Sequence, residues 1–545
     1  MTEQDHPRHT GRLSLPTTPA RTEPTLPDLD SIERRSPVAP AADDAIQFER
    51  PLSWEPERAE RESSPVDASP GEPVAPVVPT PTHRAGGSLP DWRYGADAWR
   101  LNRRLTRRHA NLMLRVRTAR ALPSSLRARF TAMGLPEDVV DETLGSIRSL
   151  DAWPDAWIAT AQRYLGDFRR QVSAGNKIDG ARNQAMAGLC YHVAQIVSDP
   201  NDRRTTVMCR AAAASLFTHA LPYVYPSATK VAVPWRAKAL PGYLHVPLEH
   251  QAAGRYGLVV LLNGASSSKE ETFTWATPFM RAGLAVLALD SPGTGEAART
   301  PFAADQDDIL DGVFDLLGAD PRLDLGQVVV VGISLGGNQA IRCAAYDRRI
   351  AGVVAVTAPV EPGRWIGRIS PLLGDELMAI SGSNAENVLS LARDLDLREA
   401  FAHVTCPVLA VGAGRDVVVP PNESQRLTQS LGALATLDWF AQSGHCVYDQ
   451  LGIWTADAAR WATAVMAARA EAGNALRSDR IEQAQAVAAS ARDALLASPV
   501  LDERPQDDEF DEGARLLAAD EVLDDDPDWY APAAEEPARL RQIRD

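Results

Sequence analysis

The stretch Val328-Val329-Val330-Val331-Gly332-Ile333-Ser334-Leu335-Gly336-Gly337 decides the fold class of this 545-residue chain. Four consecutive valines indicate a buried strand, and the residues from Asn338 to Ala345 have helical spacing. Between them lies a Gly-x-Ser-x-Gly sequence, in which small residues allow the close backbone approach of a sharp strand-to-helix turn. Without this context, the pentapeptide would fit a glycine-rich turn with a buried serine equally well. With it, Ser334 is a candidate nucleophile.

A serine hydroxyl attacks a carbonyl only when a base removes its proton, and the base needs a carboxylate to orient it. Asp416 lies just beyond an apolar run at 406–412 that predicts a strand. His445 follows 29 residues later, in Gly444-His445-Cys446. The order Ser, acid, His is the one that accompanies a strand-to-helix nucleophile. The sequence therefore predicts a catalytic triad of Ser334, Asp416 and His445.

Acyl chemistry also needs N–H groups directed at the oxygen that becomes negatively charged. We expect the backbone N–H groups of Leu335 and Ala265 to supply them, Ala265 lying in the loop after the apolar run 256–262. In the same loop, Ser268 and Glu271 have the spacing of a capping box and are interpreted as structural. Three residues are candidates for the substrate pocket: Glu296, Glu361 and Trp365.

The whole chain is predicted to form five parts, one of which contains a lid insertion. Residues 226–470 alternate short Val- and Leu-rich runs with helical patterns, which predicts a mostly parallel sheet covered on both faces. Residues 91–225 have helical spacing, an extra helical stretch at 362–404 is expected to form a small lid, and Ala-rich 471–500 extends the helical pattern. Residues 1–90 hold 16 of the 40 prolines. Residues 1–90 and the acidic segment 501–545 are both predicted to be disordered.

The distribution of charge along the chain limits which kinds of partner the protein is expected to bind. Residues 501–545 contain 16 Asp and Glu against 5 Arg, a net charge of −11 out of −16, so the rest of the chain is nearly neutral. This argues against a nucleic-acid-binding surface, which needs clustered positive charge. Nine arginines between Arg93 and Arg120 are the local exception, and they fit a solvated helix face, a contact with the acidic tail, an acidic partner or a phosphate backbone.

The five cysteines are scattered without CxxC or zinc-type spacing, so no metal site is expected and a reducing compartment is favoured. The N-terminal residues lack the apolar core of a secretory signal, and no apolar run approaches the ~20 residues that a membrane helix needs. These observations predict a cytoplasmic protein without membrane contact.

Five motifs together resemble the α/β-hydrolase superfamily: Gly264–Glu271, Asp290–Glu296, Gly332–Gly337, Asp416–Pro421 and Gly444–Cys446. More narrowly, they are similar to the branch of FrsA-like esterases, 2,6-dihydroxypseudooxynicotine hydrolases and fungal polyketide-shortening hydrolases. The resemblance spans about 95–470 and implies an α/β-hydrolase core with the preceding helical region as its cap. The chain departs from this branch at Ala265-Ser266, where Leu-Asp is usual, and at Ser291, where Gly is usual.

The predicted function is that of a serine hydrolase that cleaves an ester, a thioester or an activated ketone through an acyl-enzyme on Ser334. The scheme needs no metal or organic cofactor, and apolar residues in the cap and lid favour a medium-sized, partly hydrophobic acyl substrate. Two alternatives remain open: carbon–carbon bond hydrolysis or acyl transfer on the same triad, and a non-catalytic scaffold that acts through its tails. A protein partner bound by the tails and a homodimer are also left open.

Overall fold

The computed structural model describes residues 96–119, 124–197, 202–247, 255–368, 371–472 and 480–496. The two segments predicted to be disordered, 1–90 and 501–545, lie outside these ranges. Within the described ranges, no helix is both long and apolar enough to cross a membrane. All five cysteines are buried free thiols.

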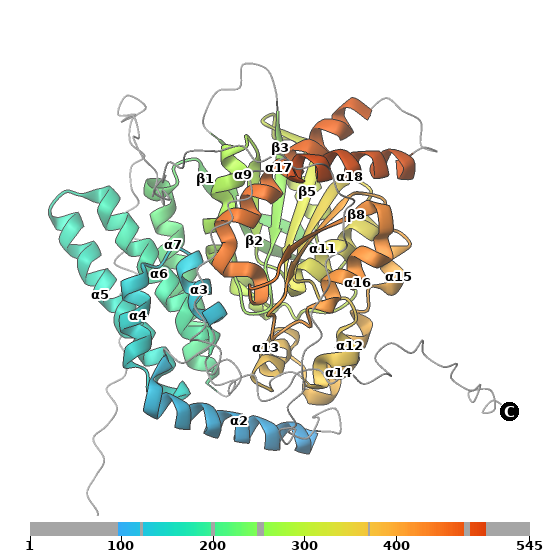
Figure 1. The fold of residues 1–545 in the computed structure, drawn as a ribbon. Helices are drawn as coiled ribbons and strands as arrows, with labels where there is room; N and C mark the ends of the chain where they lie inside the picture. Colours follow the sequence, from blue (N-terminus) through green and yellow to red (C-terminus); the bar gives the residue numbers. More distant parts are fainter. Residues whose placement is uncertain are drawn as a thin grey trace, which may run out of the picture. The chain divides into compact units, whose positions relative to one another are not determined.

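An eight-stranded sheet in the order β1-β2-β4-β3-β5-β6-β7-β8 forms the centre of the fold (Figure 1). β1 pairs with β2, and β2 with β4, in antiparallel fashion, while every pair from β4 to β8 is parallel. Strands β4, β6 and β7 are buried along their whole length, as expected for parallel strands covered on both faces. The strands are β1 (Ala228–Trp235), β2 (Lys238–His245), β3 (Tyr256–Leu262), β4 (Ala285–Leu289), β5 (Leu323–Ile333), β6 (Ile350–Val356), β7 (Val408–Ala413) and β8 (Ala435–Phe440).

Two hydrophobic cores cover the two faces of this sheet. In one, Val329 and Val331 of β5 pack with Trp454 and Trp461 of α17 (Leu451–Ala472) and with α9 (Thr277–Arg281). In the other, Val328 and Val330 share a core with the helices α10 (Asp311–Leu317), α11 (Leu335–Tyr346) and α16 (Asn422–Leu431). Helix α18 (Arg480–Leu496) packs against α17. The alternation of side chains along β5 thus supplies both cores.

The helical region before the sheet contains six α-helices in the described part of the chain: α2 (Ala96–Arg117), α3 (Ser124–Ala132), α4 (Glu137–Ser146), α5 (Trp153–Ser173), α6 (Lys177–Ile196) and α7 (Arg203–Val224). Helices α5, α6 and α7 pack side by side (Figure 1). The sequence pattern predicts helical spacing across residues 91–225 without separating the individual helices. In α6 the buried residues extend around the whole helix, so no polar face marks its period.

Four short helices occupy the predicted lid segment 362–404: α12 (Pro362–Trp365), α13 (Pro371–Ser381), α14 (Ala385–Asp394) and α15 (Arg398–Phe401). A third hydrophobic cluster joins Leu377 and Met378 of α13 to Trp365 and to Leu335, the residue after the candidate nucleophile. The insertion therefore packs directly on the start of α11. These arrangements confirm the predicted fold class, an α/β-hydrolase core with a mostly parallel sheet and a preceding helical region.

Candidate active site

Ser334 occupies a strained turn between β5 and α11. Its φ of +53° lies in the left-handed region, which is costly for a residue with a side chain and occurs mainly at functional turns. Two glycines make the turn sterically accessible, because a Cβ on Gly332 would collide with the carbonyl oxygen of Gly336 and a Cβ on Gly336 with that of Leu262. The Ser334 N–H donates to the Val356 carbonyl at 2.8 Å, which ties the turn to β6.

The structure brings together the three residues that the sequence predicted as a triad. His445 Nε2 lies 3.0 Å from Ser334 Oγ, and His445 Nδ1 lies 2.7 Å from Asp416 Oδ2. The other carboxylate oxygen of Asp416 accepts hydrogen bonds from the N–H groups of Val418 and Val419, at 2.8 and 2.9 Å. Both carboxylate oxygens of Asp416 therefore have hydrogen-bond partners, and these bonds keep the carboxylate oriented toward the imidazole.

The environment of His445 favours its protonated form. Burial by itself lowers the pKa of the imidazole, but the charge of Asp416 and its hydrogen bond raise that pKa well above 6.5. Thr357 Oγ1 approaches Nδ1 at 3.4 Å and accepts the N–H of Cys446, which fixes the start of the histidine loop. A base of this kind accepts a proton from Ser334 only after it has itself lost one to solvent.

The loop after β3 passes beside the nucleophile. A Cβ on Gly264 would lie 3.4 Å from Ser334 Cβ, and Ala265 packs on the same cluster as Leu335. In the described part of the chain, no hydrogen bond runs from the N–H of Ala265 or Leu335 to another protein group. Oxyanion binding by these two N–H groups therefore stays a prediction from the sequence.

Arg129 of α3 connects this loop to the helical region. Its guanidinium donates to both carboxylate oxygens of Glu271 at 2.8 Å, to Ser266 Oγ at 2.9 Å and to the Ser266 carbonyl at 3.1 Å. His192 of α6 adds a contact to Glu271 at 2.9 Å. Although burial raises the pKa of Glu271, Arg129 and His192 lower it to about 2. The carboxylate is therefore charged and fully bonded inside the protein.

These contacts correct one sequence-based interpretation. Ser268 does precede a helix, α8 (Lys269–Phe273), but its side chain makes no capping hydrogen bond. Instead, Ser268 Oγ lies 3.2 Å from His192 Nδ1, and Glu271 binds Arg129 and Ser267. The capping box is not formed because a buried arginine competes for the glutamate more strongly than a backbone N–H does. Both residues keep a structural role through these other partners.

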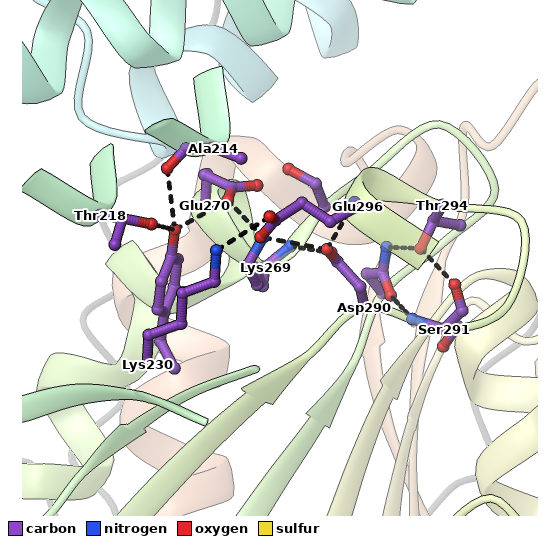
Figure 2. A network of polar contacts seen from close by, with 12 residues as sticks. Ala214, Thr218, Lys230, Lys269, Glu270, Asp290, Ser291, Thr294 and Glu296 are labelled. Atoms are coloured by element: carbon purple, nitrogen blue, oxygen red, sulfur yellow. Dashed lines mark hydrogen bonds and ion pairs between the residues drawn. The ribbon is translucent and has the colours of Figure 1, made fainter. Parts of the chain in front are cut away.

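Figure 2 shows a second buried network, centred on Lys269. The Lys269 ammonium lies 2.6 Å from Glu270, 3.0 Å from Asp290 and 2.7 Å from Glu296. Tyr243 donates to Glu270 at 3.0 Å, and Lys230 reaches Glu296 at 2.8 Å. Burial lowers the pKa of Lys269, but the three carboxylates raise it well above 10.5, so the lysine stays charged. This network links the loop after β3 to the loop after β4.

Glu376, on the lid helix α13, was not identified from the sequence. Its carboxyl is close enough to Arg129 and His445 for their charges to act on it. Burial raises the pKa of Glu376 to about 7, against the lowering effect of Arg129, Ser266 and His445.

The three pocket candidates lie in different surroundings. The partners of Glu296 are Lys230 and Lys269, so its carboxylate belongs to the second buried network. The partners of Glu361 are arginines on neighbouring helices, Arg364, Arg398 and Arg426. In the part of the chain that the structure describes, neither glutamate side chain forms a hydrogen bond or an ion pair with a triad residue. Trp365 is buried in the cluster that contains Leu335, which places its ring in the apolar layer over the start of α11.

Comparison with known proteins agrees with this architecture. Residues 259–458 match the alpha/beta hydrolase family. A 2,6-dihydropseudooxynicotine hydrolase of Paenarthrobacter nicotinovorans is 26% identical over 269 residues, covering 49% of this chain and 71% of that protein. The alpha/beta hydrolase xenA of Xenoacremonium sinensis is 28% identical over 218 residues, covering 38% of this chain and 51% of that protein.

Among solved structures, the crystal structure of the 2,6-dihydroxy-pseudo-oxynicotine hydrolase superposes with a TM-score of 0.56 at 23% identity, covering 63% of this chain and 96% of that one. At this identity the superposition establishes a shared fold. Taken with the family match over residues 259–458 and the hydrolase relatives, it leads to one conclusion: the chain has the α/β-hydrolase fold and is an enzyme of the hydrolase type.

Proposed function

We propose that this enzyme cleaves an ester, a thioester or an activated ketone through an acyl-enzyme on Ser334. His445 Nε2 takes the Ser334 proton as Oγ attacks the carbonyl, and it returns that proton to the leaving group when the tetrahedral intermediate collapses. Asp416 orients the imidazole and stabilises its positive charge. Water, deprotonated by the same histidine, then releases the acid.

The observation that carries this proposal is the continuous hydrogen-bonded chain from Ser334 Oγ through His445 to Asp416, built on a serine with positive φ. The N–H groups of Ala265 and Leu335 are the proposed oxyanion donors. One such donor contributes on the order of 10²- to 10³-fold to kcat in serine hydrolases. The apolar cluster of Trp365, Leu377 and Met378 supports a partly hydrophobic acyl group.

Labelling with a fluorophosphonate probe tests for an activated serine. We expect the wild-type protein to react, and Ser334→Ala and His445→Ala to lose the label. Ser430→Ala, which removes an exposed hydroxyl from α16, is the matched control and should label normally. Wild-type protein that is folded but stays unlabelled would contradict the proposal. Hydrolysis rates for a series of p-nitrophenyl esters would then give the preferred acyl length.

Carbon–carbon bond hydrolysis is a second candidate function, and Glu376 is the observation that favours it. Expelling a carbon leaving group requires a proton for the enolate that forms, whereas a phenolate leaves without one. Burial raises the pKa of the Glu376 carboxyl to about 7, and the charge of His445 acts on the same group. Glu376 would thus act as the acid toward the leaving enolate.

The two activities are separable with one variant. Glu376→Gln should retain hydrolysis of p-nitrophenyl esters and lose cleavage of 1,3-diketones, with products identified by mass spectrometry. Glu399→Gln, which makes the same change at an exposed position on α15, serves as the control. If the wild-type enzyme cleaves no 1,3-diketone, ester or thioester hydrolysis alone remains. If Glu376→Gln cleaves it as fast as the wild type, Glu376 is not the acid.

A further inference from the structure

Helix α2 exposes four apolar side chains along one face, an apolar stripe with Arg108 and His109 between the two pairs. Leu101 is 50% exposed, Leu105 39%, Leu112 59% and Val116 74%. At 3.6 residues per turn these four side chains fall within an arc of about 60° on the helix surface. Single exposed leucines are common, but an aligned row along one helix marks a surface that binds something.

The opposite face of α2 packs against the rest of the protein, which keeps the stripe directed toward solvent. Thr106, Ala110 and Leu114 are buried against the rest of the protein. Arg103 pairs with Asp375 of the lid helix α13 at 2.6 Å, and Arg107 pairs with Asp151 at 2.7 Å. Because the inner face is packed and ion-paired, the helix cannot turn to bury its leucines. The stripe needs an occupant from elsewhere.

The charge beside the stripe restricts what that occupant can be. Arg104, Arg108 and Arg115 are exposed and lie along one edge of the leucine row. A second copy of α2 laid on the stripe would set arginine against arginine. The complementary partner is a segment with apolar residues flanked by carboxylates.

Such a segment exists in the same chain. Residues 507–528 contain 11 Asp and Glu and one Arg, a net charge of −10, and they intersperse the apolar residues Phe510, Leu516, Leu517, Val522 and Leu523. The chain runs for 49 residues beyond the end of α18, up to about 160 Å when extended. We propose that residues 507–528 bind along the leucine stripe of α2, with their carboxylates facing Arg104, Arg108 and Arg115.

This contact places the acidic segment on the helix that supports the lid. Helix α2 packs against α13 and α14 and holds α13 through the Arg103–Asp375 pair. A segment bound to the stripe would therefore stabilise α2, which in turn supports α13, the helix that contains Glu376. The binding itself does not depend on the chemistry proposed for Ser334.

Disulfide trapping in the full-length protein tests the proposal. Every native cysteine is buried, so engineered surface cysteines react selectively. One variant combines Leu112→Cys with Leu517→Cys. The matched control combines Val207→Cys with Leu517→Cys, because Val207 on α7 is 58% exposed, close to Leu112. We expect an intramolecular disulfide to form at least ~10-fold faster in the first variant, as a docked segment has a much higher local concentration.

Two further conditions separate specific docking from chance collision. Added 1 M NaCl, or replacement of the acidic residues in 507–528 by Asn and Gln, should slow the first variant to the control rate. Equal rates in both variants would overturn the proposal, as would a disulfide-linked dimer through Leu112→Cys. The protein could instead sediment with phosphatidylserine vesicles only when the stripe is intact, while the two cysteine variants form disulfides at equal rates. That result would assign the stripe to a membrane surface.

Discussion

Lys269 is a single residue that pairs with two buried carboxylates, Glu270 and Asp290, and with the more exposed Glu296. Replacing it with methionine keeps the approximate volume but leaves Glu270, Asp290 and Glu296 with no cation at the centre of the network. Removing one partner from a buried ionic cluster costs about 3–5 kcal/mol. We expect Lys269→Met to lower the free energy of unfolding by that amount, measured by urea denaturation.

The control for this prediction is Lys238→Met, which changes an exposed lysine of β2. Its effect should stay within about 0.5 kcal/mol, as is usual for surface positions. A loss below 1 kcal/mol for Lys269→Met would show that the carboxylates do not need the ammonium.

Asp416 determines the pH at which His445 can act. Because Asp416 raises the pKa of His445 well above 6.5, a large share of the imidazole is protonated at low pH, and kcat/KM should rise as the pH increases. In Asp416→Asn the residual activity should fall on the order of 10³- to 10⁴-fold. Its pH profile should move to lower pH, because the charge that favours imidazolium is gone.

Asp449→Asn is the comparison for that measurement. Asp449 lies four residues after His445 and accepts from Ser443 Oγ, and it does not contact the imidazole. Its kcat/KM profile should match that of the wild type. A profile for Asp416→Asn that is unshifted would contradict the assigned role of the carboxylate.

At the scale of elements, helix α3 positions the loop after β3 through Arg129. Arg129→Met would leave Glu271 with His192 and Ser267 as partners and would free Ser266 from α3. Misplacing the Ala265 N–H should lower kcat about 10²- to 10³-fold with a much smaller change in KM, because the oxyanion forms after binding. Arg129→Lys should restore little, since a lysine cannot bind the carboxylate through two parallel hydrogen bonds.

Arg127→Met, on the same helix, removes a cation that pairs with Glu137 and Asp141 nearer the surface. Steady-state kinetics of this control should match the wild type. If Arg129→Met instead raises KM and leaves kcat unchanged, Arg129 binds substrate and does not position the loop.

At the scale of the whole molecule, stability should fall in acid. The folded-state pKa values of Glu270 and Glu271 are about 2, whereas an unfolded glutamate titrates near 4.5. Between those values the unfolded chain binds more protons, so the free energy of unfolding falls as the pH drops from about 4.5 toward 2. Urea titrations across this range should show the decline, and Glu271→Gln should make it shallower. An unchanged slope in this variant would contradict the pKa assignment.

The fold and the predicted triad residues were readable from the sequence because each rests on a local pattern. Four valines before a Gly-x-Ser-x-Gly turn specify a strand, a turn and a helix start in consecutive residues. Asp416 and His445 follow apolar runs, and the ends of parallel strands meet at one edge of a sheet. Local rules therefore carry most of the geometry around Ser334.

The remaining site residues depend on packing between segments that are far apart in the chain. Arg129 lies 142 residues before Glu271, so no spacing rule connects them. The charges of Arg129 and His445 act on Glu376, although the three residues lie in separate parts of the chain. The ion pairs of Glu296 with Lys230 and of Glu361 with Arg426 likewise join residues more than 60 positions apart, so no spacing rule predicts them.

The measurement that tests the central claim most directly is mass-spectrometric mapping of the acyl-enzyme. The full-length protein would be mixed with p-nitrophenyl acetate, quenched in acid within the first turnover, and digested. We predict an acetyl group on Ser334 in the wild type and none in Ser334→Ala. Turnover with the acetyl group on another residue, or with no covalent adduct under any quench time, would contradict a mechanism through Ser334.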